Sequence, residues 1–255
     1  MTTVAIVQAR MSSSRLPGKV LAPIDGTPMI VQQLRRLERS RQIDRIVVAT
    51  STDATDDPLL KVLEVSGYSV ARGPSNDVLE RFRLVVETEQ PEVIVRITAD
   101  CPLISPTVVD DVIEAFLAAR VDYASNTLDP TYPDGLDVEV MTPGAVMDLA
   151  GMQLDADERE HVTLGIYRRP ERFRLHSVQD TTKDNSGLRW TVDTQEDLDF
   201  VRWVFSEMKG VEDFDYHDVL DLVSRFPERS RTENDGVRNA ALQGKDTGRM
   251  RGVAP

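Results

Sequence analysis

The sequence has a single cysteine, Cys101, so no disulfide bond can form within the chain. No apolar run approaches the roughly 18 residues needed to span a bilayer, and the N-terminus lacks the layout of a signal peptide. Positive charge is also scarce, since 30 lysine and arginine residues face 43 aspartate and glutamate residues. A nucleic-acid surface needs clustered positive charge. These shortages predict a cytoplasmic protein that binds neither membrane nor nucleic acid.

Four short apolar runs alternate with amphipathic helical patterns in the first half of the chain. The runs are Val4–Val7, Ile46–Thr50, Tyr68–Ala71 and Val93–Ile97. Such alternation predicts an α/β fold with a mostly parallel central sheet and helices on both faces. Ligands of these sheets bind at the carboxyl ends of the strands, near a switch in strand order. We therefore expect the functional residues in the polar segments that follow these runs.

The second half of the chain alternates less regularly. Strands are predicted for residues 123–126, 136–141, 173–178 and 188–192, and helices for 143–150, 157–167 and 216–226. A further helix is expected after a capping box that begins at Thr194. From Pro227 onward the apolar pattern is lost. We expect one domain over residues 1–226 and a poorly ordered tail over residues 227–255.

The segment from Gln8 to Lys19 follows the first apolar run and combines small residues with three cations. Small residues let backbone N–H groups approach an anion, and Arg10, Arg15 and Lys19 supply fixed positive charge. The P-loop pattern G-x-x-x-x-G-K-[ST] is absent. In a chain with a net charge of −13, this concentration of cations predicts a triphosphate-binding loop. A basic surface loop is the structural alternative.

Two isolated aspartates lie where side chains extend over the carboxyl edge of the predicted sheet. Asp100 follows the fourth apolar run, and Asp193 precedes the capped helix. Magnesium is usually held by one or two carboxylates together with ligand phosphates. Opposite a basic phosphate loop, the pair predicts a Mg²⁺ site that serves attack on a nucleoside triphosphate. Alternatively, Asp100 caps a turn and Asp193 favours the positive end of its helix.

Several segments together resemble the cytidylyltransferases of the spore-coat polysaccharide (SpsF-like) type, relatives of the CMP-Kdo and CMP-sialate synthetases. The matching segments are residues 8–11, 14–21, 48–53, 72–73, 76–79, 81–82, 96–103, 125–127, 132–140, 159–162 and 190–194. The resemblance implies a Rossmann-like nucleotide-diphospho-sugar transferase fold with an inserted β-hairpin region. It also implies a cytidylyltransferase domain over residues 1–226, with CTP and Mg²⁺ used and pyrophosphate released. The family often dimerises through the inserted hairpin, here expected from residues 132–141 onward.

The resemblance assigns roles residue by residue. Arg15, Lys19, Asp100 and Asp193 are the expected catalytic residues, and the metal ligands are Asp100 and Asp193. Nucleotide binding is assigned to Ala9, Arg10, Met11, Ser12, Arg15, Lys19, Arg72, Asn76, Asp77 and Asp100. Ser12 is a departure, because relatives often have glycine there, and serine is small enough that little change is expected.

The acceptor is expected to contact a polar set in the second half of the chain. Its members are Tyr132, Asp134, Asp137, Glu139, Arg159, Glu160 and His161. Arg159 is suited to clamp a carboxylate or phosphate through two hydrogen bonds. The alternative for residues 158–161 is a solvated helix face.

We therefore predict a Mg²⁺-dependent homodimeric cytidylyltransferase that transfers CMP from CTP to a small anionic sugar-like acid for polysaccharide or related biosynthesis. Three alternatives stay open. One is a glycosyltransferase of the same fold that uses a preformed nucleotide sugar, although a D-x-D pair is absent after the fourth run. Another is a nucleotidyltransferase that acts on a sugar or polyol phosphate or a phosphonate with another nucleotide. The third is a nucleotide-binding regulatory or scaffold protein without turnover.

Overall fold

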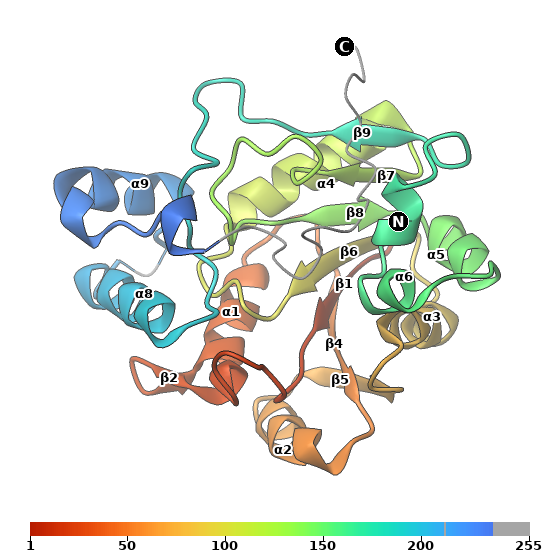
Figure 1. Ribbon diagram of the computed structural model, residues 1–255, viewed down its shortest axis with the longest axis horizontal. Helices are drawn as coiled ribbons and strands as arrows, with labels where there is room; N and C mark the ends of the chain where they lie inside the picture. The colour runs from red at the N-terminus through yellow and green to blue at the C-terminus, as the bar shows by residue number, and fades with distance from the viewer. Residues whose placement is uncertain (212, 237–255) are drawn as a thin grey trace.

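The computed structural model describes residues 1–211 and 213–236. Its centre is a seven-stranded sheet in the order β5-β4-β1-β6-β8-β7-β9 (Figure 1). The strands are β1 Thr3–Gln8, β4 Arg45–Ser51, β5 Ser69–Gly73, β6 Val93–Thr98, β7 Tyr123–Ser125, β8 Glu139–Met141 and β9 Leu175–Ser177. All neighbouring pairs are parallel except those of β8, which is antiparallel to both β6 and β7. The predicted mostly parallel sheet is confirmed.

Helices cover both faces of the sheet and bury two apolar clusters. The helices are α1 Met29–Leu37, α2 Asp57–Val65, α3 Val78–Glu89, α4 Pro106–Ala119, α5 Pro143–Ala150, α6 Ala156–Glu160, α7 Leu164–Tyr167, α8 Gln195–Glu207 and α9 Tyr216–Arg225. Apolar side chains of α1, α4, α8 and α9 belong to one cluster, and those of α3, α5 and α7 belong to the other. Strands buried on both sides explain why the first four runs are almost wholly apolar.

The strand order places β1 between β4 and β6, so the chain reverses its direction of travel across the sheet after β5. The crevice outside the carboxyl ends of β1 and β6 is therefore the topological switch point, where open α/β sheets bind ligands. The segment after β1 and the segment after β6 meet there. Within the described residues, no helix is long and apolar enough to cross a membrane.

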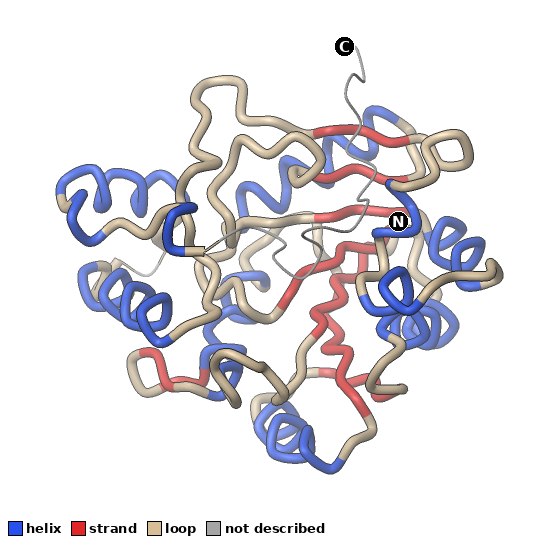
Figure 2. The backbone as a smooth tube through the Cα atoms, viewed as in Figure 1, coloured by secondary structure: helices blue, strands red, loops and turns tan. Residues whose placement is uncertain are grey.

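Three predicted elements of the second half differ in the structure. The strand predicted for 136–141 is reduced to β8, and residues 188–192 form only isolated bridges at Leu188 and Arg189. The helix predicted for 157–167 is divided into α6 and α7 around Val162, whose φ is +47°. A β-branched residue rarely adopts this conformation, so the sequence pattern gave no warning of the break. Figure 2 shows that a long loop joins β9 to α8.

The antiparallel hairpin also lies elsewhere than expected. Residues 132–141 contribute β8 to the main sheet, whereas the separate two-stranded sheet is formed by β2 Pro23–Ile24 and β3 Thr27–Pro28. Residues 227–236, at the start of the predicted tail, form two short 3-10 helices, and Thr232 pairs with Leu188, while the division into a domain and a tail stays a prediction. The remainder of that tail, residues 237–255, lies outside the described residues.

Candidate active site

The two predicted metal ligands converge on one lysine at the switch point. Lys19 Nζ lies 3.3 Å from Asp100 Oδ2 and 3.0 Å from Asp193 Oδ1, and it donates a 2.6 Å hydrogen bond to the carbonyl of Val192. Asp100 lies in the turn just after β6, and Lys19 follows the loop after the neighbouring β1. Val192 N–H donates to the Asp100 carbonyl at 2.8 Å, which ties the two acidic segments together. Three residues far apart in sequence therefore share one site.

The electrostatics of this group are mutually supporting. Burial alone would lower the pKa of Lys19, but Asp100 and Asp193 outweigh it and the pKa is raised. Burial would likewise raise the pKa of Asp100, yet the neighbouring Lys19 ammonium, helped by hydrogen bonds, lowers it. Both groups therefore stay charged near neutral pH. The pair presents a positive charge and a negative charge at the edge of the crevice.

Asp193 is held by more cations than Asp100. Its Oδ2 lies 2.8 Å from Arg15 Nη2 and accepts a 2.6 Å hydrogen bond from Arg189 Nη2. Arg189 also donates to Asp134 Oδ2 at 2.8 Å, which explains where that predicted acceptor residue points. Arg189 was not predicted as a site residue, because an arginine in an apolar, strand-like stretch gives no signal of the carboxylates around it.

The protein groups fit a divalent cation that takes most of its ligands from a bound molecule. Asp100 and Asp193 offer carboxylate oxygens, the donor type that Mg²⁺ prefers. Among the described residues, no group of three or more His, Cys, Asp or Glu side chains is placed to hold a metal. Two carboxylates with phosphate oxygens and water are the usual set for Mg²⁺ with a nucleotide.

The loop after β1 is anchored at its start and exposed in its middle. The backbone N–H of Met11 donates to Asp56 Oδ1 at 2.7 Å, and Ala9 N–H donates to the carbonyl of Ala49 at 3.1 Å. Ser12 and Arg15 are exposed. Burial would raise the pKa of Asp56, but hydrogen bonds from Ser51, Met11 and Thr50 lower it. Asp56, which was not predicted as a site residue, thus fixes the start of the loop, while Arg10 and Arg15 farther along pair with Glu160 and Asp193.

The predicted nucleotide-binding residues at the end of β5 and just after it make different contacts. Arg72 donates to the carbonyl of Ser51 at 2.7 Å and pairs with Asp57, so it braces the adjoining loop. Asp77 caps α3 by accepting from Glu80 N–H at 2.9 Å, and Asn76 is exposed. Nearby, Arg81 is buried, and its Nε and Nη1 have no hydrogen-bond partner among the described residues.

Two ion pairs bring part of the predicted acceptor set beside the nucleotide loop. Arg10 Nη2 lies 3.3 Å from Glu160 Oε1, and Arg159 Nη1 lies 2.8 Å from Asp77 Oδ2. Helix α6, which carries Arg159 and Glu160, is therefore tied to both the loop and the start of α3. His161 follows as the C-cap of α6.

Other members of the acceptor set are engaged inside the protein. Glu139 is buried and accepts hydrogen bonds from Tyr123 Oη and Thr163 Oγ1, both at 2.6 Å, and it pairs with Arg96. Tyr132 is buried too, with its ring 5.7 Å from that of Tyr216. Packing accounts for the positions of Glu139 and Tyr132, and the structure gives neither an open face toward an acceptor.

Asp137 lies on the same edge as the acidic pair. It is half-buried, and its charge raises the pKa of the Cys101 thiol, behind the larger effects of burial and Asp100. Asp137 is therefore a member of the predicted acceptor set that is both partly exposed and near Asp100. Cys101 itself is buried beside Thr98 and Asp100.

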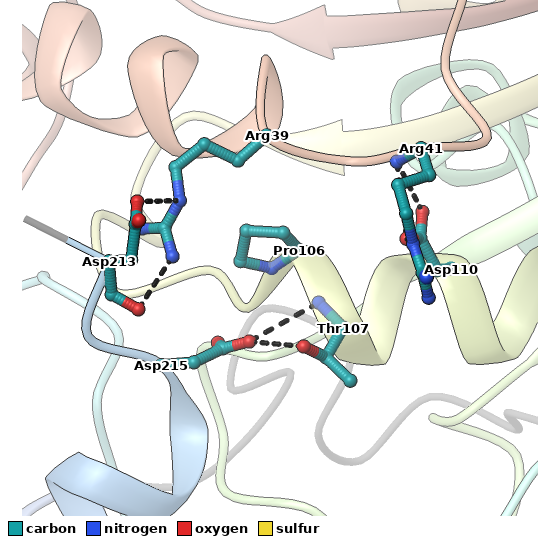
Figure 3. A pocket seen from close by; sticks show the side chains of 7 residues that line it. All are labelled: Arg39, Arg41, Pro106, Thr107, Asp110, Asp213 and Asp215. Atoms are coloured by element: carbon teal, nitrogen blue, oxygen red, sulfur yellow. Dashed lines mark hydrogen bonds and ion pairs between the residues drawn. The ribbon is translucent and has the colours of Figure 1, made fainter.

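A pocket of about 410 Å³ lies away from this group, between the start of α4 and the segment before α9 (Figure 3). None of the predicted site residues lines it. Its charged side chains have partners: Arg39 pairs with Asp213 at 3.3 Å, Arg41 pairs with Asp110 at 3.4 Å, and Asp215 accepts hydrogen bonds from Thr107. The pocket therefore offers no unsatisfied charge to a ligand.

Comparison with known proteins agrees with this geometry. The family model described as cytidylyltransferase matches residues 4–221. The spore coat polysaccharide biosynthesis protein SpsF of Bacillus subtilis is 32% identical over 229 residues, which cover 88% of this chain and 94% of that protein.

Two solved structures show the same fold. A cytidylyltransferase from Leptospira borgpetersenii superposes with a TM-score of 0.86 at 29% identity, covering 94% of this chain and 100% of the other. A CMP:2-keto-3-deoxy-manno-octonic acid synthetase complexed with CTP gives a TM-score of 0.62 at 16% identity, covering 81% and 99%. The sequence match, the strand order and the paired acidic segments at the switch point lead to one conclusion. This chain belongs to the cytidylyltransferase family.

Proposed function

We propose that the protein transfers CMP from CTP to a sugar acid or similar small anionic acceptor and releases pyrophosphate. The observation that carries the proposal is the convergence of Asp100 and Asp193 on Lys19 at the switch point. In-line displacement at phosphorus needs mainly positioning and neutralisation of charge. A site with two carboxylates for a divalent cation and nearby cations for phosphate oxygens meets both needs.

Asp100 and Asp193 would hold Mg²⁺, which supplies Lewis-acid charge to the phosphate oxygens when bound. Lys19 lies between the same two carboxylates, and its ammonium attracts both. With these carboxylates engaged by a dication, the Lys19 ammonium would be available to the triphosphate oxygens. Arg15, half-exposed above Asp193, would offset charge on the departing pyrophosphate.

In the reaction, a hydroxyl oxygen of the acceptor would form a bond to the α-phosphorus while the bond from the α-phosphorus to the oxygen that bridges to the β-phosphate breaks. Pyrophosphate leaves with that oxygen, and the hydroxyl proton passes to solvent. The nucleoside would be held by the loop from Ala9 to Ser12 and by the segment from Arg72 to Asp77. The position of α6 supports an acceptor beside this loop, because Arg159 and Glu160 already contact residues of the nucleotide side.

Homodimerisation, a cytoplasmic location and the absence of a nucleic-acid partner stay predictions. Multi-angle light scattering on the purified chain tests the dimer, and a mass of one chain would contradict it. No observation favours a glycosyltransferase or a regulatory protein over the proposed enzyme.

Pyrophosphate detection tests the proposed reaction. The protein is incubated with each of four nucleoside triphosphates, with and without Mg²⁺, and with panels of keto-acid sugars, sugar phosphates and phosphonates. The proposal expects pyrophosphate only with CTP, Mg²⁺ and an acid acceptor. Release with sugar phosphates alone would correct the acceptor class, and transfer from a preformed CMP-sugar without pyrophosphate would contradict the proposal.

A further inference from the structure

Arg189 is a buried guanidinium surrounded by carboxylates. Its side chain is 2% exposed, and its nitrogens lie 2.8 Å from Asp134, 2.6 Å from Asp193 and 3.7 Å from Asp197. A buried arginine paired with several carboxylates remains charged and has little freedom to move. It therefore fixes the direction in which the Asp193 carboxylate points.

The segment around Arg189 has no sheet to hold it. Residues 188–193 form no regular strand, so their backbone must be fixed by other contacts. On one side, Gly135 lets the chain approach closely, because a Cβ there would lie 2.6 Å from the backbone of Trp190 and Thr191. Its φ of +110° is also one that residues other than glycine rarely adopt.

On the other side the contacts come from residues 231–236, which we call the C-terminal strap. After α9 the chain turns back toward the centre of the molecule (Figure 1). Arg189 N–H donates to the carbonyl of Arg231 at 2.9 Å, and Glu233 N–H donates to the carbonyl of Gly187 at 3.0 Å. These bonds flank an antiparallel bridge between Leu188 and Thr232.

Side chains of the strap complete the enclosure. Arg231 Nη2 donates to Asp197 Oδ1 at 3.1 Å, so it shares that carboxylate with Arg189. At Gly236 a Cβ would lie 3.1 Å from Cζ and Nε of Arg189. Asp197 also accepts from the backbone N–H groups of Asp193 and Thr194, at 3.0 Å and 2.9 Å. The strap therefore contacts both the arginine and the aspartate that hold Asp193.

We propose that Arg189 is a positioning residue for Asp193, and that the C-terminal strap keeps Arg189 in place. The direction of the Asp193 carboxylate then depends on the last described residues of the chain, which lie more than thirty positions after it. The inference rests on the proposed function, since it gives Asp193 a reason to need a fixed direction. Residues that orient metal ligands through hydrogen bonds commonly affect metal affinity by about 10- to 100-fold when changed.

Two strap variants and a matched control test the proposal in the full chain. Glu233→Pro removes the N–H that bonds Gly187, at the first position of a short 3-10 helix, where proline fits the backbone. Glu233→Ala removes the same exposed side chain but keeps that N–H. Gly236 has an extended backbone that any residue can adopt, so Gly236→Ala leaves the hydrogen bonds of the strap intact. The added methyl group crowds the guanidinium of Arg189.

The measurement is the dissociation constant of CTP by titration calorimetry, with and without Mg²⁺, beside urea unfolding of each variant. We expect Glu233→Pro and Gly236→Ala to reduce the gain in affinity from Mg²⁺ about tenfold, and to leave CTP binding without Mg²⁺ unchanged. Glu233→Ala should behave as wild type. An unchanged Mg²⁺ gain in both variants overturns the positioning role, whether or not stability falls. If Mg²⁺ does not change the CTP affinity of the wild type, the proposed function is overturned, and this inference is overturned with it.

Discussion

Asp100 and Asp193 meet at one lysine, but the molecule holds them in different ways. Asp100 follows a strand that is hydrogen-bonded on both sides, so the sheet fixes its backbone. Asp193 lies on irregular backbone and is directed by Arg15, Lys19 and Arg189. One half of the site is therefore built by secondary structure and the other by charged side chains. Variants on each side should fail in different ways.

The largest effect is expected from removing either carboxylate charge. Asp100→Asn or Asp193→Asn should lower turnover by about 100-fold or more, because charge stabilisation of the phosphates is lost. Both variants should still fold, as judged by far-UV circular dichroism. Pyrophosphate release at saturating CTP measures the loss. Unaltered activity in either variant would remove that residue from the proposed metal site.

Next in size is a backbone change at the irregular side. Gly135→Ala places a methyl group 2.6 Å from the backbone of Trp190 and Thr191 and strains a φ of +110°. We expect a loss of about 3 kcal/mol in the free energy of unfolding, measured by urea titration. Gly144→Ala on α5 is the matched control, since the nearest neighbouring atom there lies 3.8 Å away. Equal stability in the two variants would mean that residues 188–193 adjust without strain.

This contrast also explains how much the sequence could predict. The strands and helices of the first half follow from local apolar patterns, and their order placed Lys19 and Asp100 at one sheet edge. Asp56 and the strap gave no signal, because their partners lie more than thirty positions away in the sequence. Arg189 gave none either, because its pairing with Asp193, four positions on, needs an irregular backbone, and its other partner Asp134 is distant in the sequence. The burial of two predicted acceptor residues has the same origin. Glu139 and Tyr132 read as polar contacts in sequence but are enclosed by segments that only the folded chain brings near.

Lys19 connects the two sides, so its removal should affect phosphate binding without affecting recognition of the nucleoside. Lys19→Ala is expected to weaken CTP binding about tenfold, as loss of one charge-assisted contact would. Titration calorimetry with CTP measures this, and cytidine serves as the control ligand because it carries no phosphate. Weakening of both ligands to the same degree would show that the loop itself has moved.

The pH dependence of stability should sharpen the difference further. Lys19 lowers the pKa of Asp100, so this carboxylate adds stability above its unfolded pKa of about 3.9, and that contribution is lost as pH falls through the lower folded value. The free energy of unfolding of the wild type should exceed that of Asp100→Asn by about 1 kcal/mol at pH 6, and this difference should shrink as the pH falls below about 3.9. Urea titrations from pH 6 to pH 2.5 measure it. A difference that is constant over this range would contradict the assigned pairing.

The smallest effect on stability is expected where α6 meets the nucleotide loop. Arg10 and Glu160 are each 43% exposed, so water and salt weaken their attraction. Glu160→Gln should change the free energy of unfolding by less than about 0.5 kcal/mol. If α6 borders the acceptor, the same variant should still raise the KM for the acceptor while the CTP affinity stays unchanged. Glu160 would then affect the reaction while contributing little to the free energy of unfolding, whereas Gly135 is expected to affect mainly the free energy of unfolding. The KM is measured by pyrophosphate release over a range of acceptor concentrations. An unchanged KM would mean that α6 does not contact the acceptor and that this ion pair is only a surface contact.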